Sequence, residues 1–174
     1  MPSPPRAILQ IVPELNAGGA ERSTLEMVQA IAGAGGRAIV ASRGGRLEKD
    51  IAAAGGEFVR LPAHSKNPAT IYANAGRIAR LVEEERVDLL HVRSRAPAWS
   101  ALWAARRTGR PLVATYHGAY ETKSALKRFY NSAMVRADRV IANSAYTAKS
   151  VSAQYRFDRG KLRTIPRGAD LDVF

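Results

Sequence analysis

Residues 7–31, AILQIVPELNAGGAERSTLEMVQAI, contain the change of pattern that decides the fold. The apolar run Ala7–Val12 predicts a buried strand, and the apolar residues of Ala20–Ala34 recur at helical spacing. A strand that leads directly into an amphipathic helix forms the first two elements of a βαβ unit. We therefore expect a parallel α/β sheet that begins with these residues.

Gly18 and Gly19 stand where the strand has ended and the helix begins. The first N–H groups of a helix are free to bind an anion, and glycine lets the anion approach because it has no Cβ. The spacing is neither G-x-G-x-x-G nor that of a lysine-containing P-loop. The pair is therefore interpreted either as an anion site or as a plain tight turn.

The same alternation of apolar runs and helical patterns continues along the chain. Further strands are predicted at 38–42, 55–61, 87–92, 111–115, 139–142 and 162–165, and helices at 47–54, 69–85, 96–107, 124–136 and 145–154. Right-handed crossovers then give a doubly wound, Rossmann-like parallel sheet with helices on both faces. In such a sheet, ligands bind at the carboxyl ends of the strands.

Composition indicates one globular domain and excludes several classes of protein. The 174 residues include no cysteine, which excludes a disulfide framework and fits a reducing compartment. The N-terminus has no secretory pattern, and no apolar run approaches the roughly 20 residues of a membrane-spanning helix. We therefore expect a cytoplasmic protein.

The net charge of +12 is placed unevenly. Residues 1–86 contain 11 basic and 9 acidic residues, whereas residues 87–174 contain 16 and 6. Such a basic half attracts polyanions, which include nucleic acid, anionic lipid headgroups and phosphorylated substrates. Charge alone does not choose among these partners.

Several side chains that can carry chemistry follow predicted strands. His117 follows the fifth strand, where it can orient a donor, bind a hydroxyl or titrate, although a lone loop histidine is more often structural. Arg93 and Arg95 follow the fourth strand as anion contacts, and His91 within that strand is expected to be structural. Lys66, after the third strand, is either a contact of an acceptor phosphate or a solvated lysine.

The predicted helix 124–136 has a basic face beside aromatic residues. Lys123 and Lys127 are four residues apart and share a face, and Arg128 and Phe129 follow directly in the sequence. The pattern suits an anionic membrane surface or a phosphorylated lipid acceptor. From periodicity alone, an ordinary solvated amphipathic helix is the better explanation.

No metal site is predicted. The chain has three histidines and no cysteine, so no metal cluster can be recognised. Asp170 and Asp172 form a D-x-D pattern of the kind that holds a divalent metal in some sugar-transferring enzymes. They follow the last predicted strand at the extreme C-terminus, and we interpret them as a decoy.

Four segments, in this order, resemble the retaining glycosyltransferases of family 4. They are ILQIVPELNAGGAERSTLEMVQAI (8–31), VDLLHVRSRAPAWSALWAARRTGRPLVATYHG (87–118), ADRVIANSAYTAKSV (137–151) and LRTIPRGADLDVF (162–174). The resemblance implies half of a two-domain GT-B fold, with residues 1–165 as the N-terminal, acceptor-side domain and 166–174 as the start of the interdomain linker. The C-terminal nucleotide-sugar domain is expected to be absent from this chain.

The resemblance also implies roles for single residues. Gly18 and Gly19 would meet the diphosphate of a nucleotide-sugar donor, whose charge develops as the glycosidic bond breaks. His117 would be the catalytic-site residue beside the transferring sugar, and Ser144 would lie on the acceptor side. The family needs no metal cofactor. The chain departs from the family pattern at Arg167, where the linker usually has asparagine.

The favoured reading is therefore the acceptor-binding half of a glycosyltransferase, inactive by itself because it cannot enclose the donor. The expected acceptor is lipid-linked, lipopolysaccharide or another glycan at the inner face of a membrane. A nucleic-acid-binding α/β domain would use the same charge, but no helix-turn-helix, RRM or KH pattern is present, so no nucleic acid is expected. Half of a dehydrogenase would need the glycine fingerprint that this chain lacks.

Overall fold

The computed structural model describes residues 7–119 and 124–168, which form one sheet of seven parallel strands with flanking helices. The strands are β1 (Ala7–Ile11), β2 (Arg37–Ser42), β3 (Glu57–Arg60), β4 (Leu89–Val92), β5 (Leu112–Tyr116), β6 (Arg139–Ala142) and β7 (Leu162–Thr164). The helices are α1 (Gly19–Gly33), α2 (Glu48–Ala53), α3 (Pro68–Glu84), α4 (Ala98–Thr108), α5 (Ala125–Asn131) and α6 (Ala145–Gln154), with two short 3₁₀ helices, η1 (Met134–Arg136) and η2 (Arg159–Lys161). The predicted doubly wound, Rossmann-like fold is confirmed.

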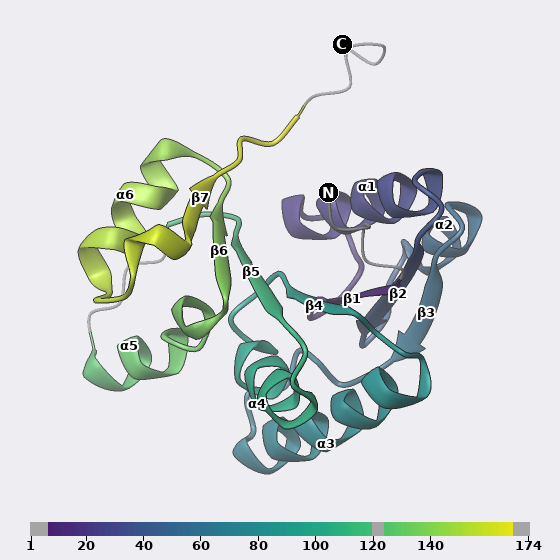
Figure 1. Cartoon of the computed structure of the whole chain (residues 1–174), viewed down its shortest axis with the longest axis horizontal. Helices are drawn as coiled ribbons and strands as arrows, with labels where there is room; N and C mark the ends of the chain where they lie inside the picture. The colour runs from purple at the N-terminus through teal and green to yellow at the C-terminus, as the bar shows by residue number, and fades with distance from the viewer. Residues whose placement is uncertain (1–6, 120–123, 169–174) are drawn as a thin grey trace.

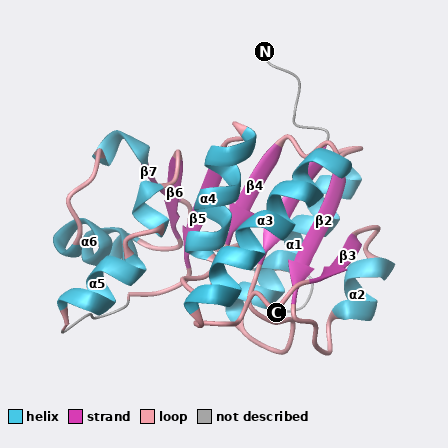
Figure 2. Cartoon of the chain, turned by 90° about the horizontal axis from the view of Figure 1, so that it is seen from below, coloured by secondary structure: helices cyan, strands magenta, loops and turns pink. Residues whose placement is uncertain are grey.

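The strand order β3-β2-β1-β4-β5-β6-β7 reverses direction between β1 and β4. Helices α1 and α2 lie on one side of the strands, and α3 and α4 lie on the other (Figure 1). Figure 2 shows the strands side by side, with α4 and α3 crossing in front of them. The chain therefore leaves β1 toward one face and β4 toward the other, which opens a crevice at their carboxyl ends.

Alternate residues of the central strands supply two hydrophobic cores, one on each side of the sheet. In β2, Ala38 and Val40 pack beneath α1 and α2, whereas Ile39 and Ala41 belong to the larger cluster on the other side. Strands buried on both faces read as continuous apolar runs, which is why the sequence showed them clearly.

The predicted helix 124–136 is wrong as a single element. Helix α5 ends at Asn131, and the hydroxyl of Ser132 donates to the carbonyl of Phe129 at 2.7 Å. The chain then turns inward as η1, in which Met134 is fully buried against β5 and β6. Burial of this apolar turn outweighs continuation of a surface helix.

Two aspartates hold the amino ends of neighbouring strands. Asp88, just before β4, accepts a hydrogen bond from the N–H of Ala7 in β1 at 2.9 Å. Asp138, just before β6, accepts one from the N–H of Leu112 in β5 at 2.8 Å. These bonds satisfy the first N–H groups of both strands and help to fix the register.

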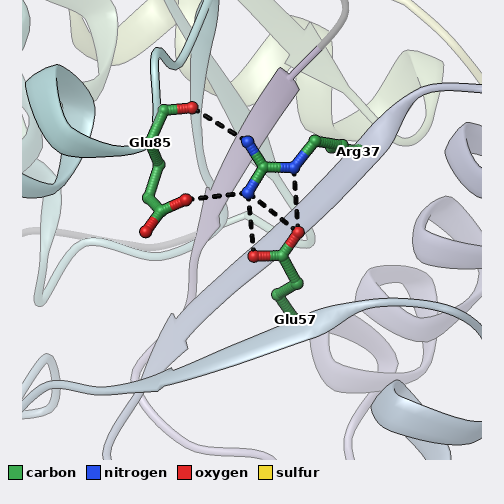
Figure 3. A network of polar contacts seen from close by, with 3 residues as sticks. All are labelled: Arg37, Glu57 and Glu85. Carbon is green, nitrogen blue, oxygen red and sulfur yellow. Dashed lines mark hydrogen bonds and ion pairs between the residues drawn. The ribbon is translucent and has the colours of Figure 1, made fainter.

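A surface network joins three elements at the same amino edge of the sheet (Figure 3). Arg37 Nη2 lies 2.9 Å from a carboxylate oxygen of Glu57 in β3 and 2.7 Å from Glu85 Oε2 at the end of α3. Hydrogen bonds to Glu57 and Glu85 raise the pKa of Arg37 above its ordinary value. The side chains are about half exposed, so each pair contributes about 1 kcal/mol or less.

Substitution of Gly56 tests the packing of α1 and α2 on the sheet. A Cβ at Gly56 would lie 2.6 Å from Val28 Cγ1 and 3.0 Å from Ile51 Cγ2, so we expect Gly56→Ala to lower the free energy of unfolding by about 1–3 kcal/mol. Gly76, inside α3, has no atom within 4 Å of its Cβ position, and Gly76→Ala should raise the same quantity by about 0.5–1 kcal/mol. Urea denaturation measures both. Equal effects of the two substitutions would contradict this account of the packing.

Candidate functional site

The glycine loop stands at the carboxyl end of β1. Gly18 has an extended backbone with φ −114° and precedes the first turn of α1, while Gly19 begins the helix. A Cβ at Gly18 would overlap the carboxylate oxygen Oε2 of Glu21, so the glycine is what allows that carboxylate to lie against the loop. The carboxylate of Glu21 therefore lies near the start of α1, where the helix dipole favours a negative group, but no side chain of the described residues forms a cap hydrogen bond there.

A second pair of glycines packs against the backbone of the segment that leads into this loop. The sequence did not single these glycines out. Gly44 and Gly45 follow β2 with φ values of 103° and 152°, a region that side chains rarely adopt. The N–H of Leu15 donates to the carbonyl of Gly44 at 3.0 Å, and a Cβ at Gly45 would overlap the carbonyl of Leu15. The two loops therefore run in close backbone contact.

A cavity of about 710 Å³ opens in front of the glycine loop. Its walls include Gly18 and Gly19, together with three arginines, Arg22, Arg46 and Arg167. Asp50 is the one acidic residue among the described residues that line it. Because the arginines come from α1, the loop after β2 and the last described segment, tertiary structure alone brings them together around a space suited to an anion.

Arg93 lies at the crevice between β1 and β4 and is far more buried than its sequence predicted. Only 4% of the residue is exposed, and its Nε donates to Oε1 of Gln10 in β1 at 2.9 Å. Gln10 in turn donates to the carbonyl of Thr24 in α1 at 3.3 Å. No carboxylate forms an ion pair with Arg93 in the part of the chain that the structure describes.

Burial lowers the pKa of Arg93 to about 10, opposed by the charge of Glu26, so the guanidinium stays protonated at neutral pH. Its positive charge is therefore held in a desolvated position, and only Gln10 hydrogen bonds to its Nε. A buried guanidinium that no carboxylate of the described residues contacts favours the binding of an anion. The polar residue inside the apolar run AILQIV was the one signal in the sequence for this network.

His117 follows β5 as predicted and lies within electrostatic reach of Arg93 and Arg167. Burial, with the charges of these arginines, lowers the pKa of His117 to about 4, so the imidazole is neutral at pH 7. Its Nε2 is buried and has no hydrogen-bond partner among the described residues. A neutral ring with one free nitrogen can bind a hydroxyl without adding charge.

His91 lies beside this group as a buried member of β4. Its Nε2 is 2.7 Å from the hydroxyl oxygen of Thr115 in β5. Burial, with the charges of Arg93 and His117, lowers the pKa of His91 well below its ordinary value. The ring therefore packs as a neutral, hydrogen-bonded part of the sheet.

The backbone of His117 is held by residues that follow β6. Nδ2 of Asn143 donates to the carbonyl of His117 at 3.0 Å, and Oδ1 of Asn143 accepts from the hydroxyl of Thr147 at 2.9 Å. Ser144 caps α6: its hydroxyl oxygen accepts from the N–H of Thr147 at 3.1 Å and donates to the Thr147 hydroxyl at 3.0 Å. This chain of bonds places the loop after β5, and Ser144 already uses its hydroxyl in the helix cap.

The remaining predicted residues lie in other places. Lys66 is an exposed side chain in the loop between β3 and α3. Lys127 and Arg128 are exposed on α5, and Arg128 lines a groove of about 840 Å³ between α5 and the end of α6. That groove shares no lining residue with the cavity at the glycine loop. Lys123 falls outside the described residues.

Neither a metal cluster nor a membrane span is found in residues 7–119 and 124–168. There, no three His, Cys, Asp or Glu side chains are placed to hold a metal ion. No helix of those residues combines the length and the apolar character needed to cross a bilayer. Asp170 and Asp172 lie outside the described residues.

The family model for Glycosyltransferase Family 4 matches residues 17–173. This chain belongs to glycosyltransferase family 4. The match runs through the glycine loop, the β4 and β5 loops and the linker, so the resemblance drawn from four sequence segments is confirmed. In this GT-B half domain, Gly18, Gly19, Arg93 and His117 follow the carboxyl ends of β1, β4 and β5.

Individual relatives agree with this assignment. A D-inositol 3-phosphate glycosyltransferase of Nocardiopsis dassonvillei is 31% identical over 104 residues, which are 53% of this chain and 24% of that protein. A glycosyltransferase structure from Rickettsia africae has 36% identity and a TM-score of 0.84, and the match covers 95% of this chain and 44% of that one. Anabaena HepE, solved with UDP and glucose, has 19% identity and a TM-score of 0.76 over 95% of this chain and 45% of its own. The family 4 chain thus spans less than half the length of each of these proteins.

The depressed pKa of His117 predicts how stability depends on pH. Between pH 6.5 and about 4, the unfolded chain binds a proton at this ring that the folded chain does not, so stability falls as pH falls through this window. Between pH 7 and pH 4, the free energy of unfolding should fall by about 2 kcal/mol less in His117→Gln than in wild type. This value is smaller than the full pKa shift implies, because the ring is partly exposed to solvent.

Denaturant titrations at both pH values measure this difference. His64→Gln is the matched control because His64 is an exposed loop histidine. An identical pH dependence in wild type and His117→Gln would show that the ring is not held neutral by its surroundings.

Proposed function

We propose that this chain is the N-terminal, acceptor-side half of a retaining glycosyltransferase that moves a hexose from a nucleotide-sugar donor to a glycan or lipid-linked acceptor. One observation carries the proposal. The glycine loop, the arginines Arg93 and Arg167, and the neutral ring of His117 lie close together at the point where the strand order reverses. This is where doubly wound sheets bind their ligands. Anabaena HepE, with the same fold, was solved with UDP and glucose, which supports a nucleotide-sugar donor.

At the donor end, Gly18 and Gly19 would present their N–H groups to the diphosphate. The charge on the leaving phosphate rises as the glycosidic bond breaks, so donors aimed at it stabilise the transition state more than the ground state. The arginines lining the same cavity add positive charge. We propose that this protein-derived charge serves in place of a divalent metal.

Next to the donor, His117 would orient the transferring sugar. Its buried Nε2 has no partner among the described residues and can accept from, or donate to, a sugar hydroxyl. A neutral ring suits this role because it does not compete with the arginines for the phosphate. Asn143 fixes the loop, which limits the freedom of the ring to move away.

At the acceptor end, we propose Arg93, Ser144 and Lys66 as contacts, with Arg93 the strongest candidate. A buried guanidinium selects an anionic acceptor, because a neutral molecule would leave its charge uncompensated. The relative from Nocardiopsis is named for a phosphorylated acceptor, D-inositol 3-phosphate, which fits this preference. The lipid-linked and lipopolysaccharide-type acceptors expected from the family would supply such a group through their phosphates.

Transfer needs a second domain. The described residues offer an open cavity at one edge of a single sheet, which does not exclude water or hold both reactants. We therefore propose that donor and acceptor meet between this domain and a nucleotide-sugar domain that is not among these 174 residues, and that this chain alone is inactive.

Titration of the 174-residue chain with UDP tests this proposal. We expect the amide signals of Gly18 and Gly19 to shift, because the diphosphate binds their N–H groups, while the same sample transfers no sugar from UDP-glucose. The amide of Gly109 is the internal control, because Gly109 caps the C-terminal end of α4 and does not line the cavity at the glycine loop. Saturating UDP that leaves Gly18 and Gly19 unmoved would remove the donor site, and measurable sugar transfer would refute the inactivity of the chain.

We further propose that α5 docks on the anionic inner surface of a membrane, so that the protein is a peripheral cytoplasmic one. Leu126 and Phe129 are 78% and 58% exposed on this short helix, beside Lys127 and Arg128. The groove behind the helix is lined by four arginines, Arg128, Arg136, Arg156 and Arg159. Apolar side chains flanked by basic ones bind the interface of an anionic bilayer.

Vesicle sedimentation tests the membrane proposal. The chain should bind phosphatidylcholine vesicles that contain phosphatidylglycerol, and the double substitution of Leu126→Ser and Phe129→Ser should weaken binding by about tenfold, because two apolar side chains no longer enter the interface. Tyr146→Ser, which removes an aromatic residue that is 75% exposed on α6, is the control and should leave binding unchanged. Equal loss in both proteins would argue against a specific role of α5.

A further inference from the structure

An ion pair ties the last described segment of the chain to the first helix. Nη2 of Arg167 lies 2.7 Å from Oε1 of Glu26 in α1, and 141 residues separate the two in sequence. Nη1 of the same guanidinium lies 3.6 Å from the position that a Cβ would take at Gly19. Arg167 therefore reaches across the first turn of α1 and forms part of the wall of the cavity at the glycine loop.

Glu26 and Arg167 are both well exposed, with 47% and 39% of their side chains open to solvent. An exposed ion pair of this kind is worth about 1 kcal/mol or less, so either partner is readily exchanged. The guanidinium has five N–H donors in a planar fork that fits two phosphate oxygens at once. A diphosphate carries more negative charge than one carboxylate, and it would lie on the side of the guanidinium that faces Gly19.

Glu26 also compensates a second positive charge. Its carboxylate opposes the lowering of the pKa of Arg93, and Arg167 contributes to the lowering of the pKa of His117. The four side chains therefore share one electrostatic environment. In the absence of a ligand, Glu26 is the acidic residue that balances both guanidinium groups.

We propose that Arg167 is a ligand of the donor diphosphate and that Glu26 holds it in place until the diphosphate binds. On binding, the guanidinium exchanges the carboxylate of Glu26 for phosphate oxygens at the glycine loop. The inference rests on the proposed donor site at Gly18 and Gly19. Because Arg167 lies in the predicted start of the interdomain linker, the exchange releases this segment from α1 each time the donor enters.

If the ion pair between Glu26 and Arg167 were purely structural, substitutions of the two residues would affect diphosphate binding in a different way from the proposed exchange. If the pair only fastened the segment to α1, loss of either partner would have the same effect, and diphosphate affinity would not change in opposite directions. If Arg167 binds the diphosphate, loss of Glu26 frees a phosphate ligand and removes a competing negative charge. The two substitutions then act with opposite sign.

Amide chemical-shift titrations of the 174-residue chain with UDP and with inorganic pyrophosphate distinguish these cases. Arg167→Gln should weaken both ligands about tenfold, because one charged, bidentate contact is lost. Glu26→Gln should strengthen both about threefold, because no carboxylate competes for Arg167. In the double variant, Glu26→Gln should strengthen binding less than it does in wild type, because the guanidinium that it frees is absent.

Two variants and one ligand control for charge alone. Arg163→Gln removes a positive charge from exposed β7, and Glu57→Gln removes a negative charge at the amino edge of the sheet. Both should leave the affinity for UDP within twofold of wild type. Uridine, which has no phosphate, should respond to none of the substitutions.

The outcomes separate this inference from the proposed function. If UDP shifts the amides of Gly18 and Gly19 but Arg167→Gln binds like Arg163→Gln, the role of Arg167 is overturned and the donor site stands. If Glu26→Gln weakens binding as Arg167→Gln does, the pair is a structural fastening and the exchange is overturned. If neither UDP nor pyrophosphate moves these amides in wild type, both the donor site and the exchange are overturned.

Discussion

The hydrogen bond between Arg93 and Gln10 joins the two strands at which the sheet reverses its order, and the electrostatics of the site depend on it. Because only 4% of Arg93 is exposed, its guanidinium needs partners inside the protein to replace the water that would solvate its charge. Gln10 supplies one partner at 2.9 Å, and the backbone N–H of Arg93 is held by the carbonyl of Ile11 at 3.1 Å. The charge is thereby held in the crevice that the doubly wound topology creates.

The fixed charge explains the state of its neighbours. Two histidines at the ends of β4 and β5 remain neutral, because burial and the nearby arginines disfavour a further positive charge. Glu26 on α1 balances the arginines without touching Arg93. The edge of the sheet therefore combines a protonated guanidinium at Arg93 with a neutral imidazole at His117.

Backbone geometry makes the cavity beside this charge. Gly18 lets a carboxylate lie against the start of α1, and Gly44 and Gly45 let the loop after β2 pack on the backbone of Leu15. A side chain at Gly45 would push the two loops apart, because its Cβ would overlap the backbone carbonyl of Leu15. The basic groove between α5 and α6 is a different surface that shares no lining residue with this cavity.

The sequence by itself determined most of the order of elements and the fold class, because buried parallel strands and amphipathic helices leave periodic patterns that need no long-range information. The family followed from the resemblance of four sequence segments to glycosyltransferase family 4, which the family model matches. It also placed Gly18, Gly19 and His117 at strand ends. It did not show that the helix after residue 124 breaks at Ser132, since that break depends on the burial of Met134 against β5 and β6. Nor did it show that Ser144 caps α6, that Gln10 holds Arg93, or that Arg167 meets Glu26 across 141 residues. Those contacts depend on which strands are neighbours and how the loops pack, and only the tertiary structure decides them, because charge, desolvation and hydrogen-bond geometry act between residues that are distant in the chain.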